Sequence, residues 1–404
     1  ALKHDYPAAH NNLGTALHKM DHLEKAQESF REAILLNPKI AEFHFNLGNT
    51  LSDSKKLLEA KISYEKAIGL NPNHDESYVN LGIIFQDIGQ LKDAEECYNK
   101  ALILNPESVP ALMSRWKLFF EKGEYEAALR DSDFCITISS DQKKIDPLNP
   151  HQKSLEALYA LGRIEEIYER IEILFKSNPD NLEIAAFASF LAKTEKRNTV
   201  NNFCNNPMDF IYFNNISSHV EDSGAFVTEV IEELQEVETT WEPNKKATRK
   251  GFQTPQNVNL FANESEKITE LKSIIISEIN LYYEKFKNET CSYIKKWPLK
   301  GSLFGWHVIL KQQGYQNAHI HPDGWLSGVI YLKVVPSLEK DEGAIQFNLS
   351  GEYYSNINSP KITYQPKEGD IVFFPSSLHH RTIPFTTDTD RIIISFDMQP
   401  LGLI

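Results

Sequence analysis

The sequence predicts two domains of different classes: an all-α solenoid of repeats, followed by a β domain of the jelly-roll type with flanking helices. Three observations support this prediction. A 34-residue period runs through the first part of the chain, a polar stretch follows near residue 200, and short apolar runs separated by turn residues fill the part after residue 297. The length of 404 residues also exceeds what one ordinary hydrophobic core requires.

The period is carried by the same types of residue at equivalent positions of three successive units. Glycines, alanines, aromatic residues and prolines recur in phase: Gly14, Gly48 and Gly82; Ala26, Ala60 and Ala94; Phe30, Tyr64 and Tyr98; Ala33, Ala67 and Ala101; Pro38, Pro72 and Pro106. Small residues let two helices cross closely, and proline ends each unit because it cannot continue a helix. A single unit cannot bury its apolar face alone, so we expect the units to stack.

Each unit resembles the tetratricopeptide repeat, which is a helix–turn–helix unit. The clear repeats span residues 7–40, 41–74 and 75–108. The pattern degrades after residue 108, and terminal repeats are usually atypical because they cap the stack. We therefore expect degenerate repeats and a closing helix to extend the tetratricopeptide-repeat solenoid over residues 1–195. The chain does not begin with methionine, so it is expected to be processed or to continue upstream.

One column of asparagines stands out in the repeats. Asn12, Asn46 and Asn80 share a position on the first helix of each repeat, and the resemblance places that position on the concave groove of the array. A side-chain amide donates and accepts hydrogen bonds at once, which matches an extended peptide backbone. We predict that these residues bind a protein or peptide partner. The alternative interpretation is that they help to pack the helix pair.

The polar, asparagine-rich residues 196–208 are expected to form a linker to a second domain at residues 209–404. In that domain we expect helices at about 225–238 and 267–287, where apolar residues recur at helical spacing. Strands are expected in FIYFNNI, LFGWHVIL, GVIYLKVV, GAIQF, ITYQ, DIVFFP and RIIISFDM. This spacing of short strands is typical of a sandwich or jelly roll, the architecture to which cupin-like barrels belong.

The sequence has thirteen histidines, and three features that suit a metal site concentrate in the predicted β region. His319, His321 and Asp323 are spaced two residues apart, and residues two apart on a strand face the same side. His380 follows the run DIVFFP, and Arg391 opens the strand RIIISF. Imidazoles and carboxylates at one barrel mouth suit a first-row transition metal, as in the arrangement of two histidines and one carboxylate that holds non-haem Fe(II). An arginine on the next strand suits a bidentate clamp for a carboxylate cosubstrate.

Because of these histidines and this arginine, residues 209–399 resemble a 2-oxoglutarate/Fe(II)-dependent oxygenase of a prolyl-hydroxylase-like family. The segments that carry the resemblance are HIHPDGWLSGVIYLK, DEGAIQF, GDIVFFPSSLHHRTIP and DRIIISFDM. The resemblance implies a double-stranded β-helix fold, Fe(II) and 2-oxoglutarate as cofactors, and ascorbate as a candidate reductant. Bacterial proteins of this kind often carry tetratricopeptide repeats ahead of the oxygenase.

The resemblance also implies roles for single residues. His380 matches the distal metal ligand, because it precedes a short stretch that ends in proline. Arg391 matches the residue that binds the 5-carboxylate of 2-oxoglutarate, and Tyr331 matches a tyrosine that reaches the same cosubstrate. Ser395 lies on the same face of its strand as Arg391 and is expected to assist. No catalytic side chain is predicted beyond the metal site.

Two interpretations of the remaining metal ligands stay open. A His-x-His pattern gives a three-histidine site of His319, His321 and His380, and the family resemblance favours it. A literal His-x-Asp pattern instead makes Asp323 the third ligand, with His321 and His380. In the family resembled here, the position that matches Asp323 is commonly small or polar instead of acidic. Asp323 is therefore the less favoured candidate for the third ligand.

The function predicted from these features is a 2-oxoglutarate- and Fe(II)-dependent dioxygenase that hydroxylates a substrate recruited by the repeats. A protein or peptide substrate fits best with the repeats, and a small molecule is the other possibility. The alternatives are a non-catalytic repeat scaffold with a degenerate barrel, or a cupin metalloenzyme that does not use 2-oxoglutarate.

Composition excludes several other classes. The net charge of −14 and the pI of about 5.5 argue against a nucleic-acid binder, which needs a basic face. No apolar run approaches the roughly 18 residues that span a bilayer, and the first residues lack the apolar core of a signal peptide. The four cysteines show no short metal-binding spacing. We therefore expect a cytoplasmic protein without disulfides and without a membrane or nucleic-acid partner.

Overall fold

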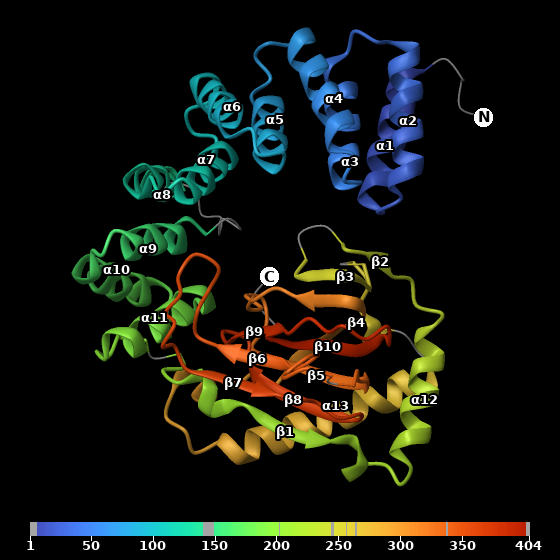
Figure 1. The fold of residues 1–404 in the computed structure, drawn as a ribbon, viewed down its shortest axis with the longest axis vertical. Helices are drawn as coiled ribbons and strands as arrows, with labels where there is room; N and C mark the ends of the chain where they lie inside the picture. Colours follow the sequence, from blue (N-terminus) through green and yellow to red (C-terminus); the bar gives the residue numbers. More distant parts are fainter. Residues whose placement is uncertain are drawn as a thin grey trace. The chain divides into compact units, whose positions relative to one another are not determined.

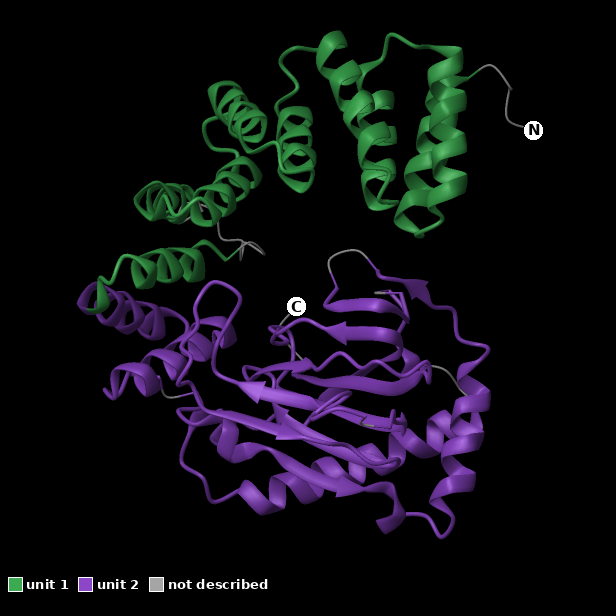
Figure 2. Ribbon diagram, in the orientation of Figure 1, with its two compact units in different colours: residues 1–164 green, residues 165–404 purple. Residues whose placement is uncertain are grey.

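A computed structural model describes residues 6–139, 149–201, 203–243, 246–255, 257–262, 265–336 and 338–400 of the chain. It divides into two compact units, residues 1–164 and residues 165–404, which are described one at a time (Figure 2). The helical repeats lie in the first unit and the β-strands lie in the second. No helix in the described part of the chain is long and apolar enough to cross a bilayer.

The first unit is built of successive antiparallel helix pairs (Figure 1). The three clear repeats give α1 (Pro7–Lys19) with α2 (Leu23–Leu36), α3 (Ala41–Asp53) with α4 (Leu57–Leu70), and α5 (Asp75–Asp87) with α6 (Leu91–Leu104). The degenerate part continues as α7 (Val109–Glu121), α8 (Tyr125–Ser139) and α9 (Pro150–Ala160). Prolines follow the ends of the second helices, at the positions that the period predicts.

The periodic glycines and aromatic residues meet in the core of each pair. A methyl group placed on Gly14, Gly48 or Gly82 would lie 2.8, 2.7 or 2.5 Å from the ring of Phe30, Tyr64 or Tyr98, respectively. The three rings are buried, as are the periodic alanines that surround them. The glycine therefore allows the first helix of each repeat to lie directly against the aromatic ring of the second helix.

The predicted asparagine column has a mixed environment. Asn12 is exposed, whereas Asn46 and Asn80 are half-buried. The Asn46 amide donates to Asn11 Oδ1 at 2.9 Å, and the Asn80 amide donates to Asn49 Oδ1 at 2.8 Å. Both bonds join one repeat to the preceding one. Two of the three amides are thus engaged in packing the array, and binding of a peptide by the column stays a prediction.

The second unit contains two antiparallel sheets (Figure 1). The seven-stranded sheet has the order β1-β8-β5-β10-β4-β3-β2, and the three-stranded sheet has the order β7-β6-β9. Their bounds are β1 (Tyr212–Asn215), β2 (Thr240–Trp241), β3 (Thr248–Gln253), β4 (Gly301–Gln316), β5 (Leu326–Lys333), β6 (Ile345–Asn348), β7 (Lys361–Tyr364), β8 (Asp370–Pro375), β9 (His379–Thr382) and β10 (Arg391–Pro400). The two sheets form the β-sandwich that the spacing of apolar runs predicts.

Helices accompany the sheets as flanking elements. They are α10 (Ile164–Ser177), α11 (Leu182–Glu195), α12 (Ser223–Leu234), α13 (Glu266–Phe286) and the short α14 (Ser292–Lys295), with single 3-10 turns at Pro207–Phe210, Ile216–Ser218 and Leu260–Ala262. Helix α13 covers the outer face of the large sheet, where Tyr282 packs 5.9 Å from the ring of Phe373. The fully buried Glu278 of α13 accepts hydrogen bonds from Tyr212 and Asn214 of β1, which fixes the helix to the sheet edge.

The division into compact units does not coincide with the linker predicted at 196–208. The reason is that α11 and the residues after it pack on the β domain. Phe187 and Phe190 of α11 contact the ring of Tyr354 at 4.7 and 4.8 Å, and Phe203 contacts Trp325 at 5.1 Å. The compact units are defined by contacts in space, whereas the predicted domains are defined by the sequence pattern. The predicted domain boundaries at 1–195 and 209–404 therefore stay a prediction.

Most predicted elements of the second unit are present within a few residues. The helix expected at about 225–238 spans 223–234, and the helix expected at 267–287 spans 266–286. Strands β2, β3 and β9 were not expected. The segment of β3, TRKGFQ, and that of β9, HHRT, contain charged residues and lack the apolar alternation that marks a strand.

The close approach of helices in the repeats yields a first prediction. We expect Gly48→Ala to lower the free energy of unfolding of the first unit, because overpacking costs about 1–3 kcal/mol and alanine gains only about 1 kcal/mol over glycine in a helix. The matched control is Gly69→Ala in α4, where nothing lies within 4 Å of the added methyl group. The control is expected to be stabilised. Urea denaturation followed by far-UV circular dichroism measures both, and equal gains in the two variants would contradict the packing account.

His307 of β4 yields a second prediction. Its side chain is buried, and neither ring nitrogen has a hydrogen-bond partner among the residues that the structure describes. Burial lowers the pKa of the imidazole from 6.5 to about 4. Because the folded-state pKa is depressed, the unfolded chain binds the proton first as the pH falls below 6.5. Stability is therefore lost between pH 6.5 and pH 4, at about 1.4 kcal/mol per pH unit.

His307→Leu removes this acid sensitivity, so its free energy of unfolding should exceed that of the wild type by a margin that grows as the pH falls. The margin is expected to increase by roughly 3 kcal/mol between pH 6.5 and pH 4. Urea titrations at several pH values measure it. Parallel pH profiles for the two proteins would show that His307 is not protonated on unfolding.

Candidate functional site

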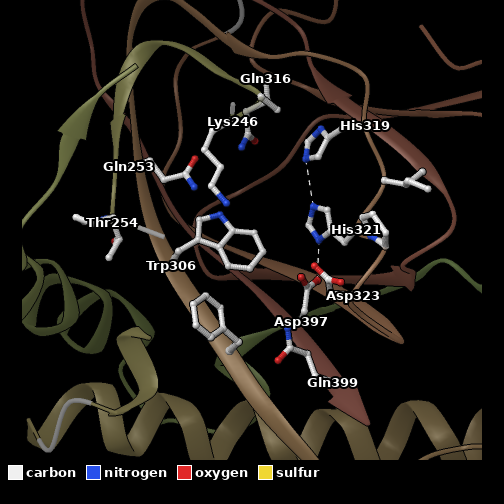
Figure 3. Close-up of a pocket in the computed structure, with 15 residues that line it drawn as sticks. Lys246, Gln253, Thr254, Trp306, Gln316, His319, His321, Asp323, Asp397 and Gln399 are labelled. Atoms are coloured by element: carbon white, nitrogen blue, oxygen red, sulfur yellow. Dashed lines mark hydrogen bonds and ion pairs between the residues drawn. The ribbon is translucent and has the colours of Figure 1, made fainter. Parts of the chain in front are cut away.

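Three imidazoles converge between the two sheets. Among the described residues, one ligand atom each of His319, His321 and His380 lies within 4.8 Å of the others. A pair of backbone hydrogen bonds, each of 3.1 Å, joins His319 to His380, and their rings lie 4.3 Å apart. Nε2 of His321 lies 3.1 Å from Nε2 of His319 (Figure 3). The segment after β4 and the strand β9, which are 61 positions apart in the sequence at His319 and His380, thus meet at one point.

The second nitrogen of each ring is held by an acceptor. Nδ1 of His319 lies 2.7 Å from the Asn317 carbonyl, and Nδ1 of His380 lies 3.2 Å from the Leu378 carbonyl. A carbonyl oxygen cannot donate, so in both rings Nδ1 carries the hydrogen and Nε2 carries the lone pair. Nδ1 of His321 lies 2.6 Å from the Asp397 carboxylate, which favours the same tautomer.

This arrangement fits a metal cation. With all three hydrogens on Nδ1, the lone pairs of the Nε2 atoms are free for a ligand, and a cation bound among them would be stabilised by all three rings. Burial, together with the neighbouring His321, lowers the pKa of His319 to about 3, and burial lowers the pKa of His380 well below its usual value. Both rings are therefore neutral ligands at neutral pH, the form in which imidazole coordinates Zn, Fe or Cu.

Asp323, the rival third ligand, lies elsewhere. It is exposed, and it is not part of the three-histidine group. The expectation that His319, His321 and Asp323 alternate along one strand is not met, because the segment leaves the strand after Gln316 and turns at Pro322 and Asp323. The short extended stretch around the His319 bridge keeps the first two side chains on one side, and the turn removes Asp323 from them.

Arg391 is the most unusual buried group of the site. It is 1 % exposed, and among the described residues its Nε and Nη1 atoms have no hydrogen-bond partner. Its guanidinium lies 5.0 Å from the ring of the fully buried Tyr331, whose hydroxyl makes no well-formed hydrogen bond within the described part of the chain. Burial lowers the pKa of Arg391 and raises that of Tyr331 to about 12. A buried, unpaired cation costs several kcal/mol, so these donors fit an anionic ligand such as a carboxylate.

Two cavities meet at the histidines. The inner one is narrow, about 20 Å³, and its walls include the predicted residues Tyr331, His380, Arg391 and Ser395 together with His319 and His321. The outer one, about 500 Å³, opens beside His319 and His321 and is lined by Trp306, Phe304, Lys246 and Asp323 among others (Figure 3). The structure thus brings together every predicted site residue of the β domain except Asp323, which lines only the outer cavity.

Sequence reasoning missed several residues of the site. Asp397 holds Nδ1 of His321, and Ser327 of β5 donates to Asp397 at 2.6 Å. The signal for Asp397 was available, because positions 391, 393, 395 and 397 alternate onto the same face of β10. Lys246 and Gln253 of the outer cavity come from a segment whose strand was not expected, and no sequence signal marks them.

Comparisons with family models agree with this geometry. A model described as "Putative 2OG-Fe(II) oxygenase" matches residues 305–397, which contain all three histidines and Arg391. Tetratricopeptide-repeat models match residues 7–40, 41–74 and 76–108. No curated protein matches the chain.

Several of the solved structures similar to this chain are described as tetratricopeptide-repeat proteins. MamA is 18% identical, with a TM-score of 0.37 and coverage of 42% of this chain and 90% of that chain. PilF of Pseudomonas aeruginosa is 20% identical, with a TM-score of 0.38 and coverage of 45% and 81%. YrrB, described as a TPR protein with an unusual peptide-binding site, is 18% identical, with a TM-score of 0.36 and coverage of 45% and 91%.

The helix pairs and the family models agree in their residues, and the sandwich holds its histidines within the matched region. The chain therefore carries three tetratricopeptide repeats followed, at residues 305–397, by a domain that matches the 2OG-Fe(II) oxygenase family.

Proposed function

We propose that this protein is a 2-oxoglutarate- and Fe(II)-dependent dioxygenase that hydroxylates a protein or peptide substrate recruited by its repeats. One observation carries the proposal: three Nε2 lone pairs converge at the wall of the inner cavity that also holds the buried, unpaired Arg391. A cation site and an anion site side by side match a metal and a dicarboxylate cosubstrate. The match to the oxygenase family supports the same conclusion.

Each residue has a definite task in this proposal. His319, His321 and His380 hold Fe(II) through Nε2, and their Nδ1 hydrogen bonds keep the rings oriented. Fe(II) and 2-oxoglutarate, when bound, supply the oxidation of a substrate C–H bond by O2. Arg391 binds the distal carboxylate of the cosubstrate through two N–H groups, because its fork matches a carboxylate.

Tyr331 and Ser395 complete the anchor. The Tyr331 hydroxyl lies in the same buried cavity as Arg391 and has a hydrogen to donate to a carboxylate oxygen. Ser395 lies two alternating positions beyond Arg391 on β10, on the same face. The inner cavity is small, so we expect its side chains to move apart when the cosubstrate enters. Its apolar walls, which include Phe374 and Ile393, exclude water from the anchor.

The outer cavity is the proposed substrate site. It shares the walls formed by His319 and His321 with the inner cavity, so a substrate atom placed there lies beside the metal ligands. Its 500 Å³ is within the range of small-ligand pockets, about 300–1,000 Å³. In the repeats, Asn12, Asn46 and Asn80 are proposed to contact the recruited partner, and recruitment raises the effective concentration of the substrate near the metal.

Two other functions make different demands on the same residues. A non-catalytic scaffold has no need of a buried arginine without a partner, since a leucine there would stabilise the fold. A cupin enzyme that does not use 2-oxoglutarate needs the histidines but not Arg391. The unpaired state of Arg391 therefore favours the proposed function over both alternatives.

The first test of the proposed function is turnover. The purified chain with Fe(II), ascorbate, O2 and 2-oxoglutarate is expected to release succinate, even without the physiological substrate. His380→Ala and Arg391→Met should lower the rate by on the order of 100-fold or more, because they remove a metal ligand and the cosubstrate anchor.

The control for this test is His379→Asn, next to His380 on β9. The His379 ring is buried against Tyr354, 5.8 Å away, and it is not part of the metal group. We expect this variant to retain the wild-type rate. Succinate release that does not depend on His380 and Arg391 would refute the proposal.

The second test uses the stability cost of Arg391. Arg391→Met is expected to raise the melting temperature of the ligand-free protein, because it removes a buried unpaired charge. The wild type should gain stability with Mn(II) and 2-oxoglutarate, about 2.7 kcal/mol at a ligand concentration of 100 Kd. Arg391→Met should lose that gain.

The matched control is Arg381→Met. Arg381 lies on β9, is exposed, and donates to Gln346 at 3.0 Å. It should leave the 2-oxoglutarate-dependent shift in melting temperature unchanged. A shift that survives in Arg391→Met would place the cosubstrate elsewhere.

A further inference from the structure

Asp397 is a buried carboxylate whose partners belong to the three-histidine group. It is 7 % exposed, and its Oδ1 atom accepts from Nδ1 of His321 and from the Ser327 hydroxyl, both at 2.6 Å. Ser327 also lies 2.8 Å from the hydroxyl of Ser376, and both serines are fully buried. In the described part of the chain, no lysine or arginine forms an ion pair with Asp397. Lys246, which lines the outer cavity together with Asp397, interacts with its charge from a distance, so the charge of the carboxylate is balanced only in part.

The charge of Asp397 becomes balanced once the site is loaded, an argument that rests on the proposed function. A doubly charged metal, the 2-oxoglutarate dianion and Arg391 together carry one net positive charge. The Asp397 carboxylate reduces that sum to zero. Because unbalanced charge is costly in a buried site, Asp397 stabilises the loaded centre more than the empty one.

We propose that Asp397 is a positioning residue of the metal centre, which fixes the tautomer of His321 and supplies through that ring the negative charge that a carboxylate ligand would supply directly. In a two-histidine, one-carboxylate site the carboxylate binds the metal directly. In this proposal Asp397 instead accepts a hydrogen bond from Nδ1 of His321, on the side of the ring that faces away from the metal. A carboxylate in this position makes the imidazole a stronger donor and holds its ring in one orientation.

The local packing is built for this contact. Asp397 of β10 is directly opposite Ser327 of β5 in the strand register, so the hydroxyl that orients the carboxylate is held by the sheet. Gly324 closes over the pair: a methyl group on it would lie 2.6 Å from Ser376 Oγ and 3.1 Å from Cγ of Asp397. The absence of a side chain at residue 324 lets the backbone pack against Ser376 and Asp397 on one side, while Asp397 also faces the outer cavity.

Asp323 does not perform this task. Its exposed carboxylate is on the turn after His321, and the structure gives it no hydrogen bond to any of the three imidazoles. We therefore expect loss of the Asp397 charge to weaken metal binding and loss of the Asp323 charge to leave it unchanged. Asp323 is a suitable control because it is also a carboxylate and lines the same cavity.

The experiment is a titration of the metal-free full chain with Co(II), followed by calorimetry and by the visible ligand-field spectrum. Asp397→Asn keeps the shape and an acceptor oxygen but removes the charge, and it should weaken Co(II) binding by about 10–100-fold. Asp397→Leu also removes the acceptor and should weaken binding further. Ser327→Ala is expected to have an intermediate effect, and Asp323→Asn to bind Co(II) within about 2-fold of the wild type.

The spectrum separates positioning from a merely structural role, because a changed ring orientation alters the ligand field of bound Co(II) even at saturation. Melting of the metal-free variants shows whether they are folded. A further readout needs no variant: nitrogen chemical shifts of the metal-free wild type should show His321 as the Nδ1–H tautomer. Finding the Nε2–H tautomer would overturn the proposal.

The outcomes for the two proposals are distinct. If the wild type does not bind Co(II), the proposed function fails. If the wild type binds Co(II) and Asp397→Asn binds it equally well with the same spectrum, the role of Asp397 is refuted and the proposed function stands. If Asp323→Asn weakens binding and Asp397→Asn does not, Asp323 is the charged partner and the inference is again refuted.

Discussion

The candidate site depends on one backbone contact, the pair of hydrogen bonds between His319 and His380. This bridge is an isolated antiparallel pairing outside the regular strands, and it connects the segment after β4 to β9. Without it the two chain segments have no register with each other, and their imidazoles have no reason to meet. The contact brings the rings of His319 and His380 together between the two sheets, because β4 and β9 belong to different sheets, whereas the anchor Arg391 is placed by the pairing of β10 within the large sheet.

The site also shows how a fold tolerates buried charge. Arg391 and Asp397 are both buried. In the described structure, Arg391 forms no ion pair with a carboxylate, and Asp397 forms none with a lysine or arginine. Each would be unfavourable in an ordinary core, where such groups are paired. Their persistence in one cavity region is consistent with ligands that supply the missing charges, a cation beside Asp397 and a carboxylate beside Arg391.

The sequence predicted the repeats well because their contacts are local. Gly48 meets Tyr64 only 16 positions away, and the same contact recurs in each of the three clear repeats, so periodicity reveals it. The roles of residues in the β domain were harder to predict. The turn after His321 includes a hydrogen bond from the His321 backbone N–H to the Ser376 carbonyl, and it breaks the simple alternation that placed Asp323 on the same face as the two histidines. The docking of α11 on Tyr354 depends on aromatic contacts between residues over 160 positions apart, which no local pattern records.

Strand β10 places the positive charge of Arg391 and the negative charge of Asp397 at opposite ends of the three-histidine group. Arg391 and Asp397 alternate onto one face of this strand, three pairs of residues apart, and its neighbour β5 supplies Tyr331 beside the first and Ser327 beside the second. A slip of one residue in the pairing of β10 would turn both charged groups to the opposite face. The register between β5 and β10 therefore sets the electrostatics at both ends of the histidine group, and the hydrogen-bonded ladder that stabilises the sheet also keeps the anion site and the cation site apart.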